Sequence, residues 1–591
     1  METAADRVPL KFLARRVDVE RRTDGTLVLC SPEPLRPYER CLGEYLERWA
    51  REKPDAVFLA ERAGEGWRTI TWRETRQTVY GIATALLSQG VSVERPVAVL
   101  SDNSIDHALM ALAAMHIGVP VAPISPAYSL MSRDFAKLRT IIDLIEPGLI
   151  FVDHPEQFER ALTSIRHHRF ELVTSANIAR LTQVTDEALV QRIFSSIGPE
   201  TIAKFLFTSG STGQPKAVIN TQRMLCSNIQ SRAQAWPFLD DEPPVLVDWL
   251  PWNHTFGGNN DFGMVLAHAG TMYIDAGKPA PGLIETTVRN LREVSATISL
   301  NAPRGYDALL PFFEKDAQLR RTFFARLRVI LYAAAALPVH VWDRLEQLSI
   351  QETGRRMHMV SGWGSTETAP QVTIVHYESR RTSVIGLPSP GYELKMVPVD
   401  NTGKYELRVR GSNVTPGYWK RPDLTAAAFD EENFYKMGDA GRFADPEDPA
   451  QGIEFAGRLA EDFKLTSATW VHVGALRMRA IAAMAPVAQD IVIAGHDCDD
   501  VGFLIFPAPG CCATDQTVRN QVREGMIRLR AEGGGSSTYA ARAVLLDEPP
   551  SIDAGEITDK GYINQRAVLE SRAEIVKRLY AQSPDDLVIV L

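Results

Sequence analysis

The stretch that decides the fold is FLFTSGSTGQPK, from Phe205 to Lys216. The apolar run Phe205 to Phe207 predicts a strand, and it leads directly into hydroxyl and glycine residues that end at a lysine. Glycines permit a tight turn that aims backbone N–H groups at an anion, hydroxyls add donors, and Lys216 adds a positive charge. The stretch therefore predicts a phosphate site made by Thr208, Ser209, Gly210, Ser211, Thr212, Gly213 and Lys216.

Two other interpretations of this loop conflict with the flanking residues. A Walker A loop counted from Gly210 requires glycine at position 215 and Ser or Thr at position 217, where the chain has Pro215 and Ala217. A flexible Ser/Gly linker would not normally separate a hydrophobic strand from the apolar run Ala217 to Ile219. We therefore keep the phosphate-loop interpretation.

The composition is that of a globular protein with several structural units. The chain has 591 residues, 45% of them hydrophobic and 23% charged, and domains usually have ~100–200 residues. These values exclude a disordered tail protein, a collagen and a coiled coil. The net charge of −9 gives no support for nucleic-acid binding, which needs a basic surface, although a local pocket can still hold an anionic ligand.

Other sequence features predict a cytoplasmic protein. No run approaches the ~18–20 apolar residues of a membrane span, and the N-terminus lacks the apolar core of a signal peptide. The six cysteines form no C-x-x-C pair, which favours reduced thiols.

Strand-like and helix-like segments alternate along most of the chain, which favours an α/β fold. Residues 97–100, 105–115 and 119–122 predict one β-α-β unit, and a second follows between residues 149 and 173. After Arg458 the chain changes to short strand-like runs before one amphipathic helix, Gln516 to Ala531, in which apolar residues recur at helical spacing. We therefore predict two domains, residues 1–458 and residues 459–591.

The loop TSGSTGQPK resembles the phosphate loop of the acyl-adenylate-forming (ANL) superfamily, which contains acyl-CoA synthetases, adenylation domains and luciferases. The resemblance covers nearly the whole chain, from about Leu42 to Leu569. The runs GRLAEDFKL, TWV and ITDKGYINQRAVL are most similar to feruloyl-CoA synthetase and its aryl-CoA ligase relatives. The resemblance implies a large, multi-subdomain N-terminal domain that binds ATP and acid, and a small, mobile α+β lid at the C-terminus.

A second motif, Gly362 to Thr368, resembles the aromatic-Gly-x-Thr-Glu segment of the superfamily. The resemblance implies that Trp363 stacks on adenine, Thr366 contacts phosphate and Glu367 holds Mg²⁺. These roles agree with the chemistry, because adenine needs a flat apolar surface and magnesium prefers carboxylate oxygen. A surface turn with an incidental acid is the alternative.

Weaker motifs complete the implied site. Asp439 and Arg458 match the superfamily's two ribose contacts. Ala334 lies in an alanine run that matches the region where the superfamily lays backbone against adenine, although core packing would give the same run. Trp252, His254 and Tyr306 match the region that lines the acyl pocket, although satisfied core aromatics would give the same pattern.

The C-terminal lysine of the superfamily, in the sequence Gly-Lys-Ile, contacts the carboxylate and α-phosphate during adenylation. Aligning on Gly561 to Ile563 puts Tyr562 at its position, and aligning on Gly555 to Ile557 puts Glu556 there. Lys560 is the only lysine in this segment, and charge on a pentavalent phosphate requires a cation. We therefore assign the role to Lys560, with a solvated loop lysine as the alternative.

Two departures from the superfamily concern the lid. The hinge position after Arg458 is Ala460, followed by Glu461 and Asp462, which leaves the swivelling residue open. Ala468 stands where the nearest subfamily has glycine, beside the path implied for the pantetheine arm of CoA. A methyl group there crowds the path or opposes a positive φ, so we expect slower CoA turnover.

The sequence thus predicts an acid–CoA ligase that uses ATP, Mg²⁺ and coenzyme A, with Thr208, Glu367 and Lys560 as catalytic residues and Glu367 as metal ligand. Ferulate-like phenylpropenoates are the first expectation for the acid. A medium- or long-chain or other aryl acyl-CoA synthetase, an enzyme that loads a carrier protein, and a degenerate acyl or nucleotide sensor stay open, as does a homodimer. We expect neither nucleic acid nor a membrane span.

Overall fold

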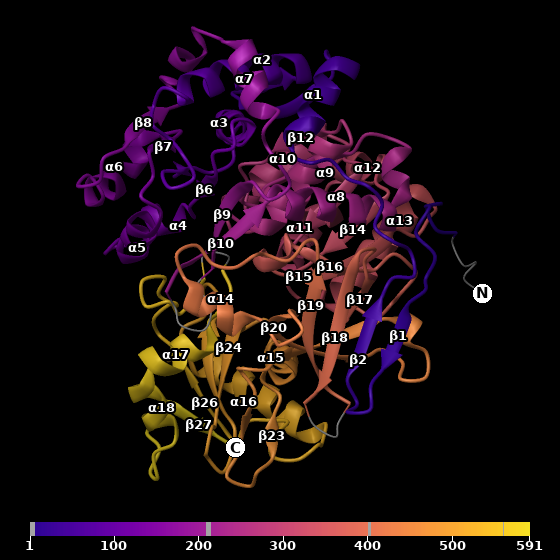
Figure 1. Ribbon diagram of the computed structural model, residues 1–591. Helices are drawn as coiled ribbons and strands as arrows, with labels where there is room; N and C mark the ends of the chain where they lie inside the picture. Colours follow the sequence, from indigo (N-terminus) through magenta and orange to yellow (C-terminus); the bar gives the residue numbers. More distant parts are fainter. Residues whose placement is uncertain (1–5, 209–213, 400–402, 559–560) are drawn as a thin grey trace.

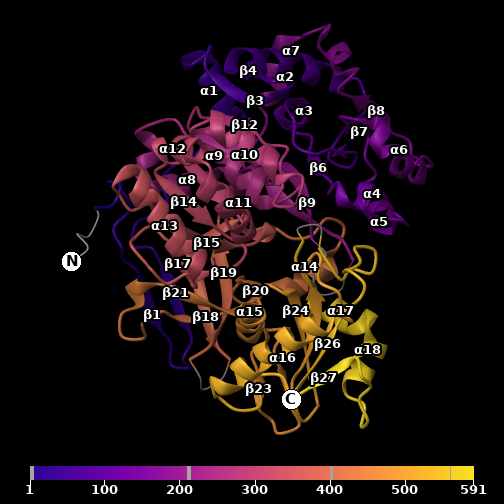
Figure 2. The same ribbon diagram turned by 180° about the vertical axis from the view of Figure 1, so that it is seen from behind.

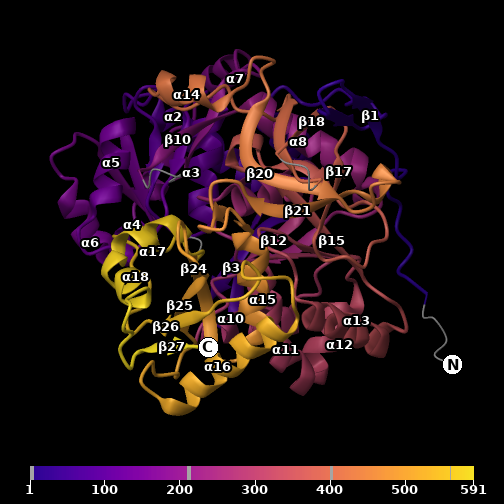
Figure 3. The ribbon, with the colours of Figure 1, turned by 90° about the horizontal axis from the view of Figure 1, so that it is seen from below.

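The computed structural model describes residues 6–208, 214–399, 403–558 and 561–591. Figure 1 shows the last part of the chain, with β24–β27 and α16–α18, gathered below a larger body built from the preceding residues. The view from behind agrees (Figure 2), and the view from below shows the same elements together on one side of the molecule (Figure 3).

A six-stranded sheet carries the predicted phosphate loop. Its strands lie in the order β10 (Lys216–Thr221), β9 (Ile202–Thr208), β6 (Val121–Pro123), β5 (Val97–Val99), β7 (Leu149–Val152) and β8 (Glu171–Thr174). The two predicted β-α-β units are confirmed, because α3 (Ile105–His116) joins the parallel strands β5 and β6, and α6 (Pro155–Ser164) joins the parallel strands β7 and β8. Only β10 runs antiparallel to its neighbour in this sheet.

An eleven-stranded sheet carries three of the other predicted site residues, Trp363, Asp439 and Arg458. Its strands lie in the order β1 (Asp18–Arg21), β2 (Leu27–Cys30), β18 (Tyr392–Pro398), β19 (Tyr405–Gly411), β20 (Tyr435–Phe443), β21 (Ile453–Arg458), β17 (Val384–Pro388), β16 (Gln371–Ile374), β15 (His358–Gly364), β14 (Val329–Tyr332) and β13 (Ile298–Asn301). A four-stranded sheet of β11 (Val245–Asp248), β12 (Thr271–Ile274), β3 (Val57–Ala63) and β4 (Gly66–Thr71) completes the body.

The C-terminal part has its own sheet and apolar clusters. The pair β22 (Phe463–Lys464) and β23 (Trp470–Val471) precedes a sheet of β24 (Ala488–Ala494), β25 (Gly502–Pro507), β26 (Arg542–Leu545) and β27 (Val588–Val590). The predicted helix is α16 (Gln516–Ala531), with the predicted bounds, and Val518, Val522, Met526 and Leu529 are its buried side. The helices α15 (Val473–Ala483), α17 (Gln565–Ser571) and α18 (Ala573–Leu579) complete this part.

The strand β21 ends at Arg458, the residue after which we predict the domain boundary. The buried carboxylate of Asp462 pairs with Lys404 of the body and also accepts a hydrogen bond from the Val473 amide at 3.1 Å. The boundary after Arg458 and the identity of the hinge residue stay predictions. No helix among the described residues is long and apolar enough to cross a bilayer.

Candidate functional site

The two strands that flank the phosphate loop place its described ends opposite each other. Lys216, the first residue of β10, is the register partner of Thr208, the last residue of β9. The Lys216 ammonium lies over the Tyr418 ring, 5.2 Å from its centroid. The predicted site residues Ser209, Gly210, Ser211, Thr212 and Gly213 lie outside the described residues.

Glu367 lies on a 3-10 turn, Thr366–Thr368, that begins after β15. The Ser365 hydroxyl accepts the amide N–H of Glu367 at 3.2 Å, and the Glu367 carbonyl accepts the amide N–H of Thr415 at 2.8 Å. These bonds fix the turn against the segment that leads to Tyr418. Thr366 and Glu367 are both buried.

The Glu367 carboxylate has a tyrosine partner, and no basic partner among the described residues. Tyr418 donates its phenol hydrogen to Glu367 Oε1 at 3.1 Å, and the phenol oxygens of Tyr418 and Tyr435 are also 3.1 Å apart. Burial, reinforced by the charge of Glu367, raises the pKa of Tyr418, which keeps the phenol a donor. No Lys, Arg or His within the described part of the chain forms an ion pair with Glu367.

A buried carboxylate that no described basic residue pairs with fits a metal ligand. Buried charges in proteins are normally paired or coordinate a metal, and magnesium prefers carboxylate oxygen together with the phosphates of its nucleotide. Glu367 is therefore suited to hold Mg²⁺, and its place beside the predicted phosphate site stays a prediction. Tyr418 and Tyr435 were not predicted from the sequence.

A second group of predicted residues meets where β15, β20 and β21 approach one another. Trp363 donates its indole N–H to Asp439 Oδ2 at 2.9 Å, and Asp439 and Arg458 are register partners whose charged groups lie 3.6 Å apart. Burial raises the pKa of Asp439, and the positive charge of Arg458 opposes that rise. The cluster thus combines a buried carboxylate with a largely exposed cation, which suits a polar ligand.

Ala334 lies near this group because β14 and β15 are parallel neighbours whose ends fall at the same edge of the sheet. It is exposed and has φ of 73°, a left-handed conformation that an alanine adopts only when its surroundings impose it. The turn thus presents main chain at the edge where Trp363 lies.

The residues predicted to line the acyl pocket do not share one environment. Trp252 is buried, with its ring 5.1 Å from His107 and 5.0 Å from Phe262. His254 is half-buried, and its Nδ1 accepts the Phe256 amide at 3.2 Å at the start of a π-helical turn, Phe256–Asp261. Such turns occur frequently at functional sites.

Tyr306, the third of these residues, is fully buried in the helix α11 (Pro303–Lys315), and its phenol donates to the carbonyls of Ser299 and Leu331. This environment is that of a satisfied core tyrosine, and a role at the acid stays a prediction. Lys204 was not predicted as a site residue. Its buried ammonium donates to the Gly258 carbonyl of the π-helical turn at 2.7 Å.

The predicted lysine, Lys560, lies outside the described residues. On either side of it, Ile557 and Ile563 form an antiparallel bridge, and the Thr558 amide donates to the Tyr562 carbonyl at 2.8 Å. Glu556, which an alternative alignment puts at the lysine position, is buried and forms an ion pair with Arg572 at 2.8 Å. That pairing gives Glu556 a structural role.

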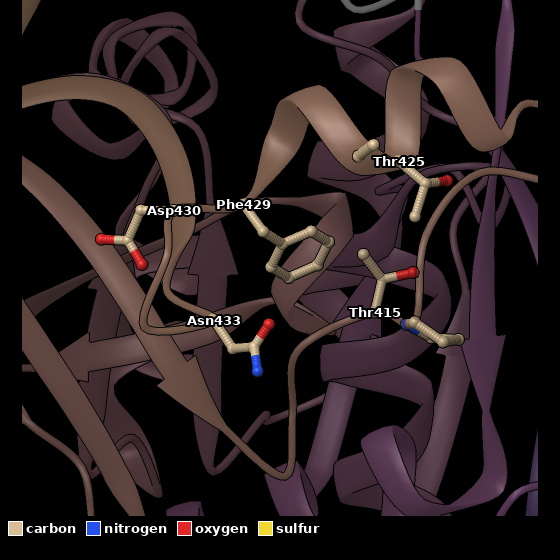
Figure 4. Close-up of a pocket in the computed structure, with 7 residues that line it drawn as sticks. Thr415, Thr425, Phe429, Asp430 and Asn433 are labelled. Atoms are coloured by element: carbon tan, nitrogen blue, oxygen red, sulfur yellow. The ribbon is translucent and has the colours of Figure 1, made fainter.

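A pocket of about 460 Å³ lies beside the turn of Glu367 without containing any predicted site residue. Figure 4 shows Thr415, Thr425, Phe429, Asp430 and Asn433 around it. Asp430 is already paired with Lys395 and Arg408. We assign it no role.

Comparison with known proteins shows which family the chain belongs to. The chain is 22% identical to a carboxylic acid reductase of Mycobacterium tuberculosis, over 88% of this chain and 47% of the reductase. It is 25% identical to 3-[(3aS,4S,7aS)-7a-methyl-1,5-dioxo-octahydro-1H-inden-4-yl]propanoyl:CoA ligase of the same organism, over 82% of this chain and 92% of that ligase. The chain therefore spans about half the length of the reductase.

The fold is that of a solved structure, ATP-bound MatB from Rhodopseudomonas palustris. The TM-score is 0.69 at 20% identity, and the match covers 90% of this chain and 99% of that one. The predicted α/β fold, with a large N-terminal domain and a small C-terminal one, is confirmed. The family model described as AMP-binding enzyme matches residues 46–419, and because this match spans more than half of the chain, the protein belongs to the family of AMP-binding enzymes.

Proposed function

We propose that this protein adenylates a carboxylic acid with ATP and transfers the acyl group to coenzyme A. In the first step a carboxylate oxygen attacks the α-phosphorus of ATP, and the bond to pyrophosphate breaks to give acyl-AMP. In the second step the CoA thiolate attacks the acyl carbon, and AMP leaves as the thioester forms. The similarity to a CoA ligase over 92% of that enzyme supports the second step.

The observation that carries the proposal is the convergence of Thr208, Lys216 and Glu367. A hydroxyl and an ammonium at the two ends of the phosphate loop suit the phosphates of a nucleotide, and Tyr418 links the lysine's environment to the carboxylate. Phosphoryl chemistry of this type relies mainly on positioning and charge neutralisation. Glu367 would hold Mg²⁺, which supplies part of that neutralisation.

The remaining residues orient the nucleotide and the acid. Asp439 accepts from the ribose hydroxyls and Arg458 lies within reach of the same group, while Trp363 offers its ring face to adenine. Lys560 approaches the α-phosphate during adenylation and withdraws for the second step as the lid turns. Trp252 and His254 contact the acid.

For the acid itself we propose a phenylpropenoate such as ferulate. The support is the likeness of GRLAEDFKL and ITDKGYINQRAVL to feruloyl-CoA synthetase, together with the aromatic surroundings of Trp252. Longer alkyl acids and other aryl acids are the competing substrates.

A second candidate function is adenylation of an acid for a carrier protein. The observation that favours it is the similarity to a carboxylic acid reductase over 88% of this chain. In that case the acyl group passes to the thiol of a carrier-bound pantetheine instead of free CoA. An acyl or nucleotide sensor without catalytic activity is the third hypothesis.

One assay separates these functions. Purified protein is incubated with ATP, Mg²⁺, labelled pyrophosphate and each of a panel of aryl, alkenyl and fatty acids, and label in ATP is measured. Exchange with an acid supports both enzyme functions, and its absence with every acid supports the sensor. Addition of free CoA then gives a thioester if our proposal is correct and leaves acyl-AMP intact if a carrier protein is the acceptor.

A further inference from the structure

A short segment of the C-terminal part, Ser551 to Ile557, touches the N-terminal body just before the position of Lys560. Asp553 Oδ1 accepts a hydrogen bond from the Ser132 hydroxyl at 2.6 Å, and its Oδ2 accepts the Arg133 amide N–H at 3.0 Å. Lys137 donates its ammonium hydrogen to the Ile552 carbonyl at 2.6 Å. Ser132 and Arg133 lie in the link between α4 (Ala127–Leu130) and α5 (Ala136–Ile145), and Lys137 lies in α5.

An apolar contact accompanies these polar ones. The Ile552 side chain is only 8% exposed and belongs to a buried cluster that contains Phe135 and Leu138 of the same N-terminal region. The cluster also contains Phe205 and Ala217, which lie on β9 and β10 at the two ends of the phosphate loop. The segment therefore belongs to an apolar cluster that extends to the sheet carrying the predicted phosphate site.

On its other side the segment is fixed to the C-terminal part. Arg572 donates to both carboxylate oxygens of Glu556 at 2.8 Å, and the Ser551 amide and the Ser571 hydroxyl donate to the same carboxylate. A carboxylate held by four donors does not rotate independently of its neighbours. Because the Ile557–Ile563 bridge follows directly, the Asp553 contact ties the strand pair at this bridge to the body.

We infer that Asp553 and Ser132 form a latch that holds the C-terminal part in the orientation seen in this structure, and that Asp553 is a positioning residue for adenylation. The effect on adenylation rests on the proposed function. If the lid turns between the two steps, both hydrogen bonds of Asp553 and the burial of Ile552 are lost together. These contacts stabilise one orientation only, so their removal shifts the population away from it.

Hydrogen–deuterium exchange tests the latch without reference to activity. The peptide that contains Arg133 is followed in the wild type, in Asp553→Ala and in Asp547→Ala, an exposed carboxylate six residues earlier that serves as the matched control. Since the Arg133 amide donates to Asp553, we expect its exchange to rise about tenfold in Asp553→Ala and to stay unchanged in Asp547→Ala. Equal exchange in all three proteins contradicts the latch.

The role in adenylation is tested by the two half-reactions of the same variants. We expect Asp553→Ala to slow acid-dependent ATP–pyrophosphate exchange about tenfold while thioester formation from supplied acyl-AMP and CoA stays within about twofold. Ser132→Ala removes one of the two hydrogen bonds of Asp553 and should give a smaller loss. The double variant should lose no more than Asp553→Ala alone, because that change already removes the Ser132 contact. Equal losses in both half-reactions, or additive losses, contradict the positioning role.

Failure of the latch and failure of the proposed function give different results. A wild type that supports no exchange with any acid overturns the proposed function, and Arg133 protection then still decides whether the latch exists. A wild type that supports exchange, together with an Arg133 amide that Asp553→Ala leaves protected, overturns the latch alone.

Discussion

Tyr418 donates a hydrogen bond to Oε1 of Glu367 at 3.1 Å, while the ammonium of Lys216 lies over the same tyrosine ring. Tyr418 thus links the predicted metal ligand, Glu367, to Lys216 of the predicted phosphate loop, 151 residues earlier in the sequence. A buried carboxylate oriented by a phenol donor is pre-organised for a cation. Several of the expected effects of substitution follow from this contact.

Replacement of the metal ligand should abolish most of the activity. We expect Glu367→Gln to lower the rate of ATP–pyrophosphate exchange by about 10²–10³-fold, as is usual when a group that stabilises developing charge is removed. Tyr418→Phe keeps the carboxylate and removes only its donor, so it should raise the Mg²⁺ concentration needed for half-maximal exchange by about tenfold or more. Titration of the rate with Mg²⁺ measures both effects, and an unchanged Mg²⁺ dependence in both variants would contradict the assignment.

Asp439→Asn should stabilise the fold while weakening the nucleotide site. Burial raises the pKa of Asp439 above its value in the unfolded chain, so the folded state binds the proton more tightly. The stability of the fold therefore falls as pH rises from the unfolded pKa to the folded pKa. Asparagine removes this penalty at neutral pH and can still accept the Trp363 indole N–H. Thermal unfolding should therefore show a higher Tm for Asp439→Asn at pH 7, and a smaller gain at pH 4, where the wild-type carboxyl is more protonated.

The effect of Asp439→Asn on the KM for ATP is measured separately. Asparagine lacks the negative charge that suits ribose hydroxyls, so the KM for ATP should rise about tenfold. A variant with lower Tm at pH 7, or with unchanged KM, would show that Asp439 does not have the dual role assigned to it.

Lys560→Ala should separate the two half-reactions. Loss of a cation near the α-phosphate slows acid-dependent exchange about 10²-fold or more, whereas attack of CoA on supplied acyl-AMP is much less affected. The two rates are measured on one preparation whose thermal unfolding matches the wild type. Equal losses in both rates would mean that another residue acts as the adenylation lysine.

Ala468 has φ of 60°, so the left-handed conformation that its position requires is present in spite of the methyl group. Such a conformation costs an L-residue about 1–2 kcal/mol, and part of that is offset by the greater entropy loss of glycine. Ala468→Gly should therefore raise the free energy of unfolding by roughly 0.5–1 kcal/mol, measured by urea denaturation.

Ala475, an exposed residue within α15, provides the control for this substitution. In a regular helix the same change should lower the free energy of unfolding by roughly 0.5–1 kcal/mol. If both variants lose stability equally, the conformation of Ala468 stores no strain. Thioester formation in Ala468→Gly tests in addition the expectation that the methyl group slows CoA turnover.

Local patterns were sufficient to predict several elements. The strand at Phe205–Phe207, which the structure extends to Ile202–Thr208, and the helix Gln516–Ala531 each follow from residues within one short window. Trp363, Asp439 and Arg458 could be predicted as a group only through the resemblance to a family, because β15, β20 and β21 meet through tertiary pairing.

The residues that could not be predicted all act through long-range contacts. Tyr418 and Tyr435 look like ordinary core aromatics until their hydroxyls meet near Glu367. Likewise β1 and β2 join a sheet beside β18, more than 350 residues later in the chain, and Asp553 finds its partner at Ser132. Such pairs leave no periodic pattern in the local sequence, because the free energy that selects them comes from burial and hydrogen bonding in the folded chain.

The most direct measurement is the exchange of labelled pyrophosphate into ATP in the presence of Mg²⁺ and a panel of carboxylic acids, with Glu367→Gln as the inactive control. The account predicts acid-dependent exchange by the wild type, strongest with a phenylpropenoate such as ferulate, and at least about a hundredfold less by the variant. No exchange with any acid, or equal exchange by the wild type and Glu367→Gln, would contradict it.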